Sequence, residues 1–326
     1  MAYDLLYTEG VIAVREKYLL KDRILRLCEM TAEDAFRSLL EYGFGGGAET
    51  ASSIHDYEKL IEREEALLDE FILDYAPSRA ESVYFLSPRD FHNAKALLKA
   101  KLLGEDAEKM LASRGLIDVE TLSACVKSGD YTVLSAFPKL KEVCQQVENA
   151  VLAGQTLSGK EIGLRFERAT YQYLLDGCRF SAFLKRSIRS KMDMTNLLTA
   201  FRATDDEDVK VSFIEGGRLR LSDVLAVRGD GWREGKAYKT YPEFLQLCIL
   251  AKERGLPLTL PERYRDGFDV EKLHENRYEL KRNEPFLYYV LCRKAENANV
   301  RIIFALQLLG ASEQEMKKRL RGVQSV

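Results

Sequence analysis

The segments Asp90–Asn93 (DFHN), Asp193–Asn196 (DMTN) and Glu296–Asn299 (ENAN) each place an acidic residue three positions before an asparagine. The copies are separated by 103 residues in both steps, although the chain contains only seven Asn. A fixed period of this kind is typical of one structural unit that is built three times. The spacing therefore predicts three repeats that share this motif.

The residues after each Asn predict a helix with the same buried face in all three copies. Apolar side chains stand one, four, five and seven positions after the Asn, which is the spacing of one helix face. They are Ala94, Leu97, Leu98 and Ala100, then Leu197, Ala200, Phe201 and Ala203, then Val300, Ile303, Phe304 and Leu306.

The acid and the Asn lie on that same face, so each carboxylate is expected to be half-buried and to need a partner. A base stands close to each acid, and the bases are Arg89, Lys191 and Lys294. In the third copy Arg301 also follows, and we expect Asn299 to bridge Glu296 and Arg301. The motif is interpreted as a hydrogen-bonded pin between neighbouring helices rather than as a catalytic group.

The rest of the chain predicts an all-α protein. It has seven Pro, and long stretches rich in Leu, Ala, Glu, Lys and Arg follow helical spacing. Residues Tyr57–Tyr75 are the clearest case, because one face is apolar and the opposite face is charged. A length of 326 residues fits three domains of about 100 residues each. Turns that contain Gly place the predicted units at residues 1–112, 113–216 and 217–326.

One segment has two interpretations. Residues Lys210–Ser222 (KVSFIEGGRLRLS) alternate around two glycines, which is typical of a β-hairpin. The matching part of the first repeat, Ser113–Leu122, indicates a Gly turn followed by a helix. We favour a helix end, a Gly turn and a new helix in both places, capped by Asp118 and Ser222.

The charge and the cysteines exclude several classes of function. Lys and Arg number 49 and Asp and Glu number 51, so no overall field favours nucleic acid, anionic lipid or a polyanionic substrate. The six Cys and three His lack the spacing of metal ligands, so we expect reduced thiols, no metal and no cofactor. The apolar stretches are too short to span a membrane and no signal-peptide pattern is present, which predicts a soluble cytoplasmic protein.

The segment Gly154–Glu161 (GQTLSGKE) matches the GxxxxGK pattern of a phosphate-binding loop. However, Glu161 stands where that loop needs Ser or Thr to hold Mg²⁺. The preceding Leu140–Leu152 has the pattern of an amphipathic helix, whereas the loop should follow a strand. We therefore expect a turn between two helices, with Ser158 capping the second helix. A nucleotide-dependent enzyme stays open as an alternative, and it would require this loop to bind phosphate.

Two further clusters have simple expected roles. The acidic run Thr204–Asp208 (TDDED) lacks the alternating ligands and the Gly of a Ca²⁺ loop, so we expect a solvated loop. Gly45-Gly46-Gly47 has no accompanying lysine and no strand, so we expect a flexible link between helices.

The C-terminal region contains Glu284–Tyr289 (EPFLYY), then Lys294–Ile303 (KAENANVRII), then Gly310 and Met316–Leu320 (MKKRL). This pattern resembles the C-terminal signature of the C/d subunit family of V-type and A-type rotary ATPases. Near the N-terminus, Val14–Leu20 (VREKYLL) is similar to the opening helix of that family. The length and the all-helical repeat also match, so the resemblance covers nearly the whole chain.

The resemblance implies a non-catalytic rotor component of an ion-translocating ATPase, in which proton or sodium transport is coupled to ATP. It implies a funnel of three pseudo-threefold-related helical units that links the central-stalk subunits to the membrane proteolipid ring. Such a component would be peripheral on the cytoplasmic side of the membrane, with no membrane span and no nucleic-acid partner. A helical-repeat scaffold in another assembly would share the same sequence features, and its partner would distinguish it.

Overall fold

The computed structural model describes residues 5–104, 106–107, 110–229, 232–274 and 283–321, and these fold into helices without a β-strand among them. The prediction of an all-α fold is confirmed. Contacts group the chain into two compact units, of which unit 1 is Met1–Ser78 with Glu262–Val326 and unit 2 is Arg79–Pro261. The threefold division at residues 112 and 216 stays a prediction.

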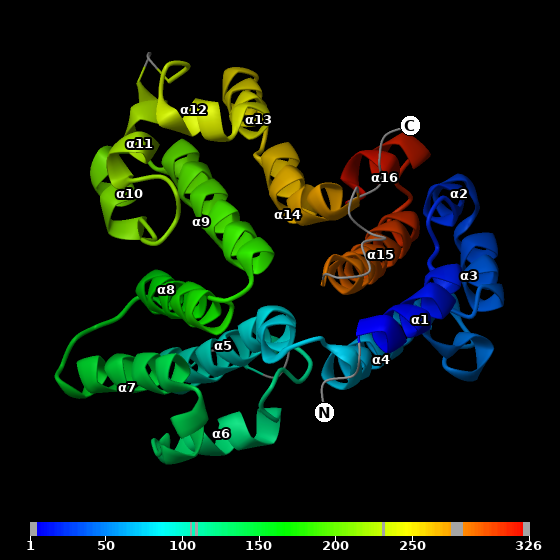
Figure 1. The fold of residues 1–326 in the computed structure, drawn as a ribbon, viewed down its shortest axis with the longest axis horizontal. Helices are drawn as coiled ribbons and strands as arrows, with labels where there is room; N and C mark the ends of the chain where they lie inside the picture. Colours follow the sequence, from blue (N-terminus) through cyan, green and yellow to red (C-terminus); the bar gives the residue numbers. More distant parts are fainter. Residues whose placement is uncertain (1–4, 105, 108–109, 230–231, 275–282, 322–326) are drawn as a thin grey trace. The chain divides into compact units, whose positions relative to one another are not determined.

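Unit 1 combines helices from both ends of the chain: α1 (Leu5–Arg15), η1 (Glu16–Tyr18), α2 (Arg23–Glu29), α3 (Ala32–Glu41), η2 (Phe44–Glu49), η3 (Ile54–Asp56), α4 (Tyr57–Tyr75), α15 (Glu284–Leu308) and α16 (Glu313–Arg319). Helix α15 packs against α4, α1 and α2, and Figure 1 shows it beside the blue N-terminal helices. The ring of Phe304 contacts Phe36 and Tyr57, at centroid distances of 6.2 and 5.6 Å. The core of unit 1 therefore depends on residues from both ends of the sequence.

Unit 2 contains α5 (Arg79–Leu103), α6 (Val119–Ser128), η5 (Thr132–Ala136), α7 (Pro138–Leu152), α8 (Gly159–Gly177), α9 (Ala182–Arg202), α10 (Asp206–Ser212), α11 (Leu221–Leu225), η6 (Ala226–Arg228), α12 (Lys236–Thr240) and α13 (Pro242–Glu253). Helix α5 packs against α8 and α6, and α8 also packs against α7 (Figure 1). Helix α9 packs against α8, α10, α11 and α13. A further helix, α14 (Thr259–His274), crosses the boundary between the two units.

The three Asn of the repeated motif all lie in long helices. Asn93, Asn196 and Asn299 belong to α5, α9 and α15, which begin at residues 79, 182 and 284. Of the apolar positions after them, four are half-buried, namely Leu97, Ala100, Phe201 and Ala203. The others are buried, and these are Ala94, Leu98, Leu197, Ala200, Val300, Ile303, Phe304 and Leu306. The predicted face is therefore fully buried only in the third copy.

The ambiguous segment Lys210–Ser222 is not a hairpin. Helix α10 ends at Ser212 and α11 begins at Leu221, which confirms the helix, turn and helix interpretation. The predicted caps are corrected in detail. Arg220 is the N-cap residue of α11 and its N–H donates to the carboxylate of Asp223, at 2.8 Å, so Ser222 does not cap this helix. Asp118 does occupy the N-cap position of α6, but its side chain makes no capping hydrogen bond.

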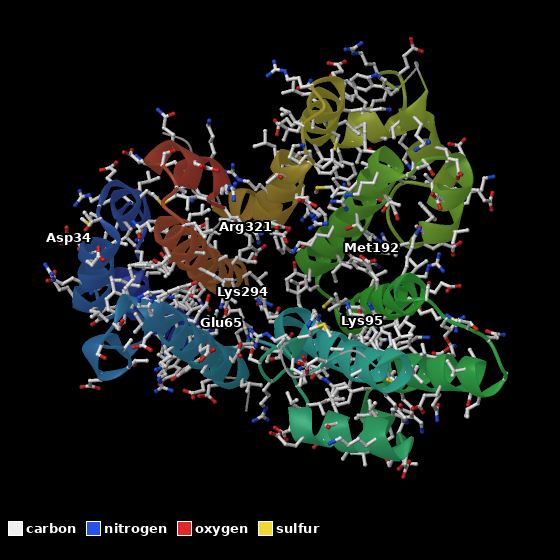
Figure 2. All side chains as sticks on the ribbon, turned by 180° about the vertical axis from the view of Figure 1, so that it is seen from behind. Asp34, Glu65, Lys95, Met192, Lys294 and Arg321 are labelled. Carbon is white, nitrogen blue, oxygen red and sulfur yellow. The ribbon has the colours of Figure 1, made fainter. Side chains whose placement is uncertain are left out.

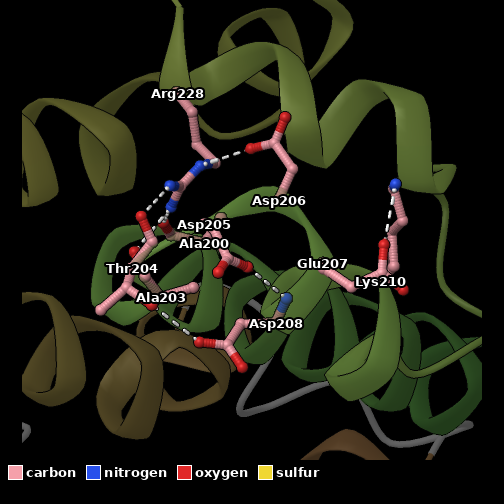
Figure 3. A network of polar contacts seen from close by, with 9 residues as sticks. All are labelled: Ala200, Ala203, Thr204, Asp205, Asp206, Glu207, Asp208, Lys210 and Arg228. Atoms are coloured by element: carbon pink, nitrogen blue, oxygen red, sulfur yellow. Dashed lines mark hydrogen bonds and ion pairs between the residues drawn. The ribbon is translucent and has the colours of Figure 1, made fainter.

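The acidic run Thr204–Asp208 is solvent-exposed over its first four residues, as expected, but it forms the N-cap and first turn of α10 rather than a loop. Asp205 is the N-cap residue, and its side chain accepts a hydrogen bond from the N–H of Asp208 at 2.8 Å. Figure 3 shows Arg228 donating to the carbonyl oxygens of Ala200, Ala203 and Thr204 and pairing with Asp206 at 2.8 Å. The acidic residues therefore favour a helix N-terminus, where carboxylates are stabilised by the exposed N–H groups.

The segment that matches a phosphate-binding loop forms a turn between α7 and α8. Ser158 caps α8, and the Glu161 carboxylate accepts from the Ser158 N–H at 2.8 Å, which completes a capping box. This confirms the expected turn and cap. The three glycines from Gly45 lie in η2, and the N–H of Gly45 donates to Glu64 at 3.0 Å. That segment is a packed turn rather than the flexible link expected.

Candidate functional site

In unit 2, two buried carboxylates tie their helices to the turns that precede α6 and α11. Asp90 accepts hydrogen bonds from the N–H groups of Leu116 and Ile117, both at 3.0 Å. Asp193 accepts from the N–H groups of Arg218 and Leu219, also at 3.0 Å. Both Asp side chains are completely buried. Without these acids the N–H groups of the turns would have no acceptor, so the carboxylate and the turn satisfy each other's hydrogen bonds.

The three Asn side chains make one shared type of contact. In α5 the Asn93 amide donates to the carbonyl of Ala112 at 3.3 Å and accepts from its N–H at 2.8 Å. Asn196 pairs with Ile214 in the same way, at 2.8 and 2.9 Å, and Asn299 pairs with Arg321 at 2.8 and 2.7 Å. Each amide thus imitates a peptide group and fixes one residue of a distant loop.

The third carboxylate uses a turn from the other end of the chain. Glu296 accepts from the N–H of Lys21 at 3.1 Å, across a separation of 275 residues. Lys21 directly precedes Asp22, which is the N-cap residue of α2. Ile117 and Leu219 stand in the same position before the N-cap residues of α6 and α11. Each of the three acids therefore binds the turn that immediately precedes a helix. We use the name clasp for this contact together with the contact between the Asn side chain, three residues later, and its backbone partner.

Two glycines permit the close approach in unit 2. A Cβ atom on Gly115 would overlap the carboxylate of Asp90, and a Cβ on Gly217 would overlap that of Asp193. In unit 1 the corresponding residue is Leu19, which is buried. There the acid is Glu296, whose side chain is one methylene longer than that of Asp. The longer acid therefore stands opposite a turn that carries a side chain where the other two turns have glycine.

The clasp of unit 1 also contains a buried ion-pair group. Arg293 donates to Glu296 at 3.0 Å and to the carbonyl of Tyr18 at 3.2 Å, and its Nε lies 3.2 Å from Glu64. The side chains of Arg293 and Glu64 are 5% and 13% exposed. The two carboxylates and the carbonyl oxygen of Tyr18 together offset the cost of burying this guanidinium group.

The bases expected beside the acids form hydrogen bonds or ion pairs with other groups, although the charge of Arg89 lowers the pKa of Asp90. Arg89 donates to the carbonyl of Arg114 at 3.2 Å, and Lys191 donates to the hydroxyl of Tyr84 at 2.6 Å. Glu296 pairs with Arg293, not with the neighbouring Lys294 as expected. The hydroxyl that donates to Asp193, at 2.7 Å, comes from Tyr241.

The predicted bridge from Asn299 to Glu296 and Arg301 is wrong. Arg301 pairs with Glu58 at 3.0 Å and Glu65 at 3.5 Å on α4, whereas Asn299 pairs with the backbone of Arg321. Arg301 is half-exposed, so its ion pairs contribute less than those of buried Arg293.

Burial dominates the protonation of all three acids. It raises the pKa of Asp90 to about 6, although the N–H groups of Leu116 and Ile117 lower it. It raises the pKa of Glu296 to about 7, against the lowering by Arg293 and by the backbone of Lys21 and Leu20. The pKa of Asp193 is raised for the same reason. Near neutral pH, Asp90 and Glu296 are therefore close to their own titration.

These contacts are suited to holding structure rather than to catalysis. The carboxylate oxygens face backbone N–H groups, and each acid lies on a different helix. Among the described residues, no group of three or more His, Cys, Asp or Glu could hold a metal ion. Sequence reasoning placed Gly115 and Gly217 in turns but missed their close approach to the acids, for which a glycine 25 and 24 positions after the respective Asp was a usable signal. It also missed Arg293 and Glu64, which no local pattern connects.

The fold and the clasps define an all-helical protein whose long helices are locked to distant turns by buried polar side chains. The sequence model of the family described as ATP synthase (C/AC39) subunit matches residues 8–319. The chain therefore belongs to this family, whose members are subunits of V/A-type ATPases. No curated protein matches the chain. In the part of the chain that the structure describes, no helix is both long and apolar enough to cross a membrane.

We predict that Gly115→Ala destabilises unit 2 by about 1–3 kcal/mol, because the new methyl group displaces Asp90 and leaves buried N–H groups without an acceptor. Gly163→Ala is the matched control. A Cβ at Gly163 meets nothing within 4 Å, so a helical Ala there should be neutral or stabilising by up to about 1 kcal/mol. Urea denaturation followed by circular dichroism, with hydrogen exchange of residues 110–118, checks both. Equal stability of the two variants would contradict the close-approach argument.

We also predict that Glu296 makes the protein less stable as the pH rises. Its pKa is about 7 in the folded protein and about 4.5 when unfolded, so the folded state holds the proton more tightly. The stabilisation from protonation is complete below about pH 4.5 and is lost as the pH rises through about 7. Glu296→Gln should flatten this fall, which is on the order of 1–3 kcal/mol for the wild type.

The comparison requires denaturation at several pH values from 4 to 8, with Glu58→Gln as the control. Glu58 also pairs with an arginine, but its side chain is 41% exposed. An unchanged pH slope in Glu296→Gln would show that this carboxyl does not titrate in the folded protein.

Proposed function

We propose that the chain is a non-catalytic coupling component of a V/A-type rotary ATPase, a socket that links the rotating central stalk to the membrane proteolipid ring. In this role it lies peripherally on the cytoplasmic side of the membrane and takes part in proton or sodium transport coupled to ATP. The observation that carries the proposal is the family match over residues 8–319. Three helical units arranged as a funnel would suit this role and remain part of the proposal.

The clasps support the proposal on physical grounds. A part that transmits torque must resist twisting, and α5 and α9 are each held to a loop by an acid and an Asn three residues apart. The buried Arg293 group adds a further tie in unit 1. Stiffness of this kind needs no active site.

The nucleotide-dependent alternative has less support. The Glu161 carboxylate and the Ser158 hydroxyl are used in the cap of α8, where they accept from backbone N–H groups. A phosphate would have to displace that carboxylate. The direct test of the proposal is to purify the tagged chain with its complex from native membranes and to identify the co-purifying proteins by mass. Recovery of stalk and ring subunits is expected, and recovery of a different assembly would identify a scaffold instead.

The expected effect of Asn299→Leu on the assembled ATPase is a loss of coupling. The substitution removes the two part-buried hydrogen bonds between the Asn299 amide and the backbone of Arg321, at a cost of about 1–3 kcal/mol. The contact between α15 and the loop after α16 should loosen while unit 2 keeps its structure. ATP hydrolysis should then persist while ion pumping falls.

Asn149→Leu is the matched control, since Asn149 is exposed on α7. It should leave both activities unchanged. Hydrolysis and pumping are measured side by side in membranes that contain equal amounts of each variant. A proportional fall of both activities in Asn299→Leu, or no change in either although the variant assembles, would contradict the coupling role.

A further inference from the structure

Unit 2 contains a pocket of about 770 Å³ between α5, α8, α9 and α10, and the clasps and the family assignment leave it unexplained. A volume of this size accommodates a small organic molecule. Phe91 and Phe166 line it and are each only 1% exposed, so their rings belong to the core as well. Pro88, Leu164 and Tyr171 add apolar surface to a lining that also contains charged side chains.

The same pocket is lined by a half-buried ammonium group. It belongs to Lys95 on α5, which is labelled in Figure 2. Among the described residues, no hydrogen bond or ion pair joins its side chain to another group. Burial lowers the pKa of Lys95 and nearby Lys99 lowers it further, while Glu167 acts in the opposite direction. A half-buried cation of this kind is stabilised when an anion lies beside it.

The other charges at the pocket restrict the anion. Lys160 and Arg202 line it together with two carboxylates, Glu167 and Asp208. Lys160 lies 3.8 Å from Asp208, which compensates part of its charge. The two carboxylates would repel a dianion such as inorganic phosphate. A single negative charge next to Lys95 avoids most of this repulsion.

We propose that this pocket binds a small amphipathic carboxylate, whose alkyl or aryl part contacts Phe91 and Phe166 and whose carboxylate pairs with Lys95. The apolar part is stabilised by removal of its surface from water. The charged end supplies orientation and selectivity. The proposal does not depend on the role of the chain in the ATPase, because all of the lining residues belong to unit 2.

Gly163 provides a way to close the pocket without disturbing the fold. It lines the pocket from α8, and a Cβ built on it meets nothing within 4 Å. A glutamine there would extend into the open space and exclude a ligand. Gly10 on α1 is a matched control, because it is also helical and also has open space around a Cβ.

The experiment measures the displacement of anilinonaphthalene sulfonate, a fluorescent aryl anion, from the full-length protein by octanoate. We expect octanoate to displace it, octanol to do so at least about tenfold less effectively, and inorganic phosphate to have no effect. Lys95→Gln and Gly163→Gln should each weaken octanoate binding by about tenfold or more. Lys95→Arg keeps the charge and should bind within a few-fold of wild type. The controls Lys127→Gln, at an exposed lysine of α6, and Gly10→Gln should match wild type.

Three results would overturn the proposal. The first is equal octanoate binding by wild type and either pocket variant, provided that circular dichroism shows a folded protein. The second is equal displacement by octanol and octanoate, which would remove the role of the charge. The third is binding of the protein to phosphatidylglycerol vesicles that octanoate does not inhibit. That result would mean that the basic side chains of the pocket bind a membrane surface instead of a small carboxylate.

Discussion

A buried carboxylate that accepts hydrogen bonds from the backbone of a distant turn fixes each of the helices α5, α9 and α15. Moving a charged carboxylate out of water costs several kcal/mol, and the raised pKa values of Asp90 and Glu296 reflect this cost. The turn has the opposite need, because a buried N–H group without an acceptor is also unfavourable. Each group offsets the cost of the other, so helix and turn form as one structure.

The three clasps reach this result in two ways. Asp90 and Asp193 are short acids opposite Gly115 and Gly217, whose missing side chains leave room for the carboxylate. Glu296 is a longer acid opposite Leu19, and the following Lys21 has a positive φ of 46°. Such a conformation is uncommon outside glycine. The third clasp therefore combines a longer acid with a turn that has a side chain in place of the glycine, and Arg293 pairs with the buried acid.

The sequence could predict the helices because their signal is local. The apolar spacing in Tyr57–Tyr75 matches α4, and the acid and Asn spacing located α5, α9 and α15. The partners of the acids could not be predicted in this way. A backbone N–H has no signature in the sequence, so Leu116 and Lys21 could not be recognised as partners of the acids. The prediction instead assigned each acid to a base one or two residues away. In the third copy, Lys294 is closer to Glu296 in the sequence, but Arg293 makes the ion pair. The position of a residue around the helix axis decides which base faces Glu64 and Glu296.

Two contacts at different points of one helix restrict its movement more than a single contact of twice the strength. A single hydrogen-bonded contact would still permit the helix to pivot about it. The acid and the Asn stand three residues apart, which is about 4.5 Å along a helix. In α5 they hold Leu116 and Ala112, two points of a single short loop, and in α9 they hold Arg218 and Ile214. Because both ends of a four-residue stretch are fixed, neither sliding nor rotation of the helix can occur without breaking one of the contacts. This double attachment gives unit 2 a stiffness that suits the proposed coupling role, and its contacts lie inside the protein, where salt in the surrounding solution screens them very little.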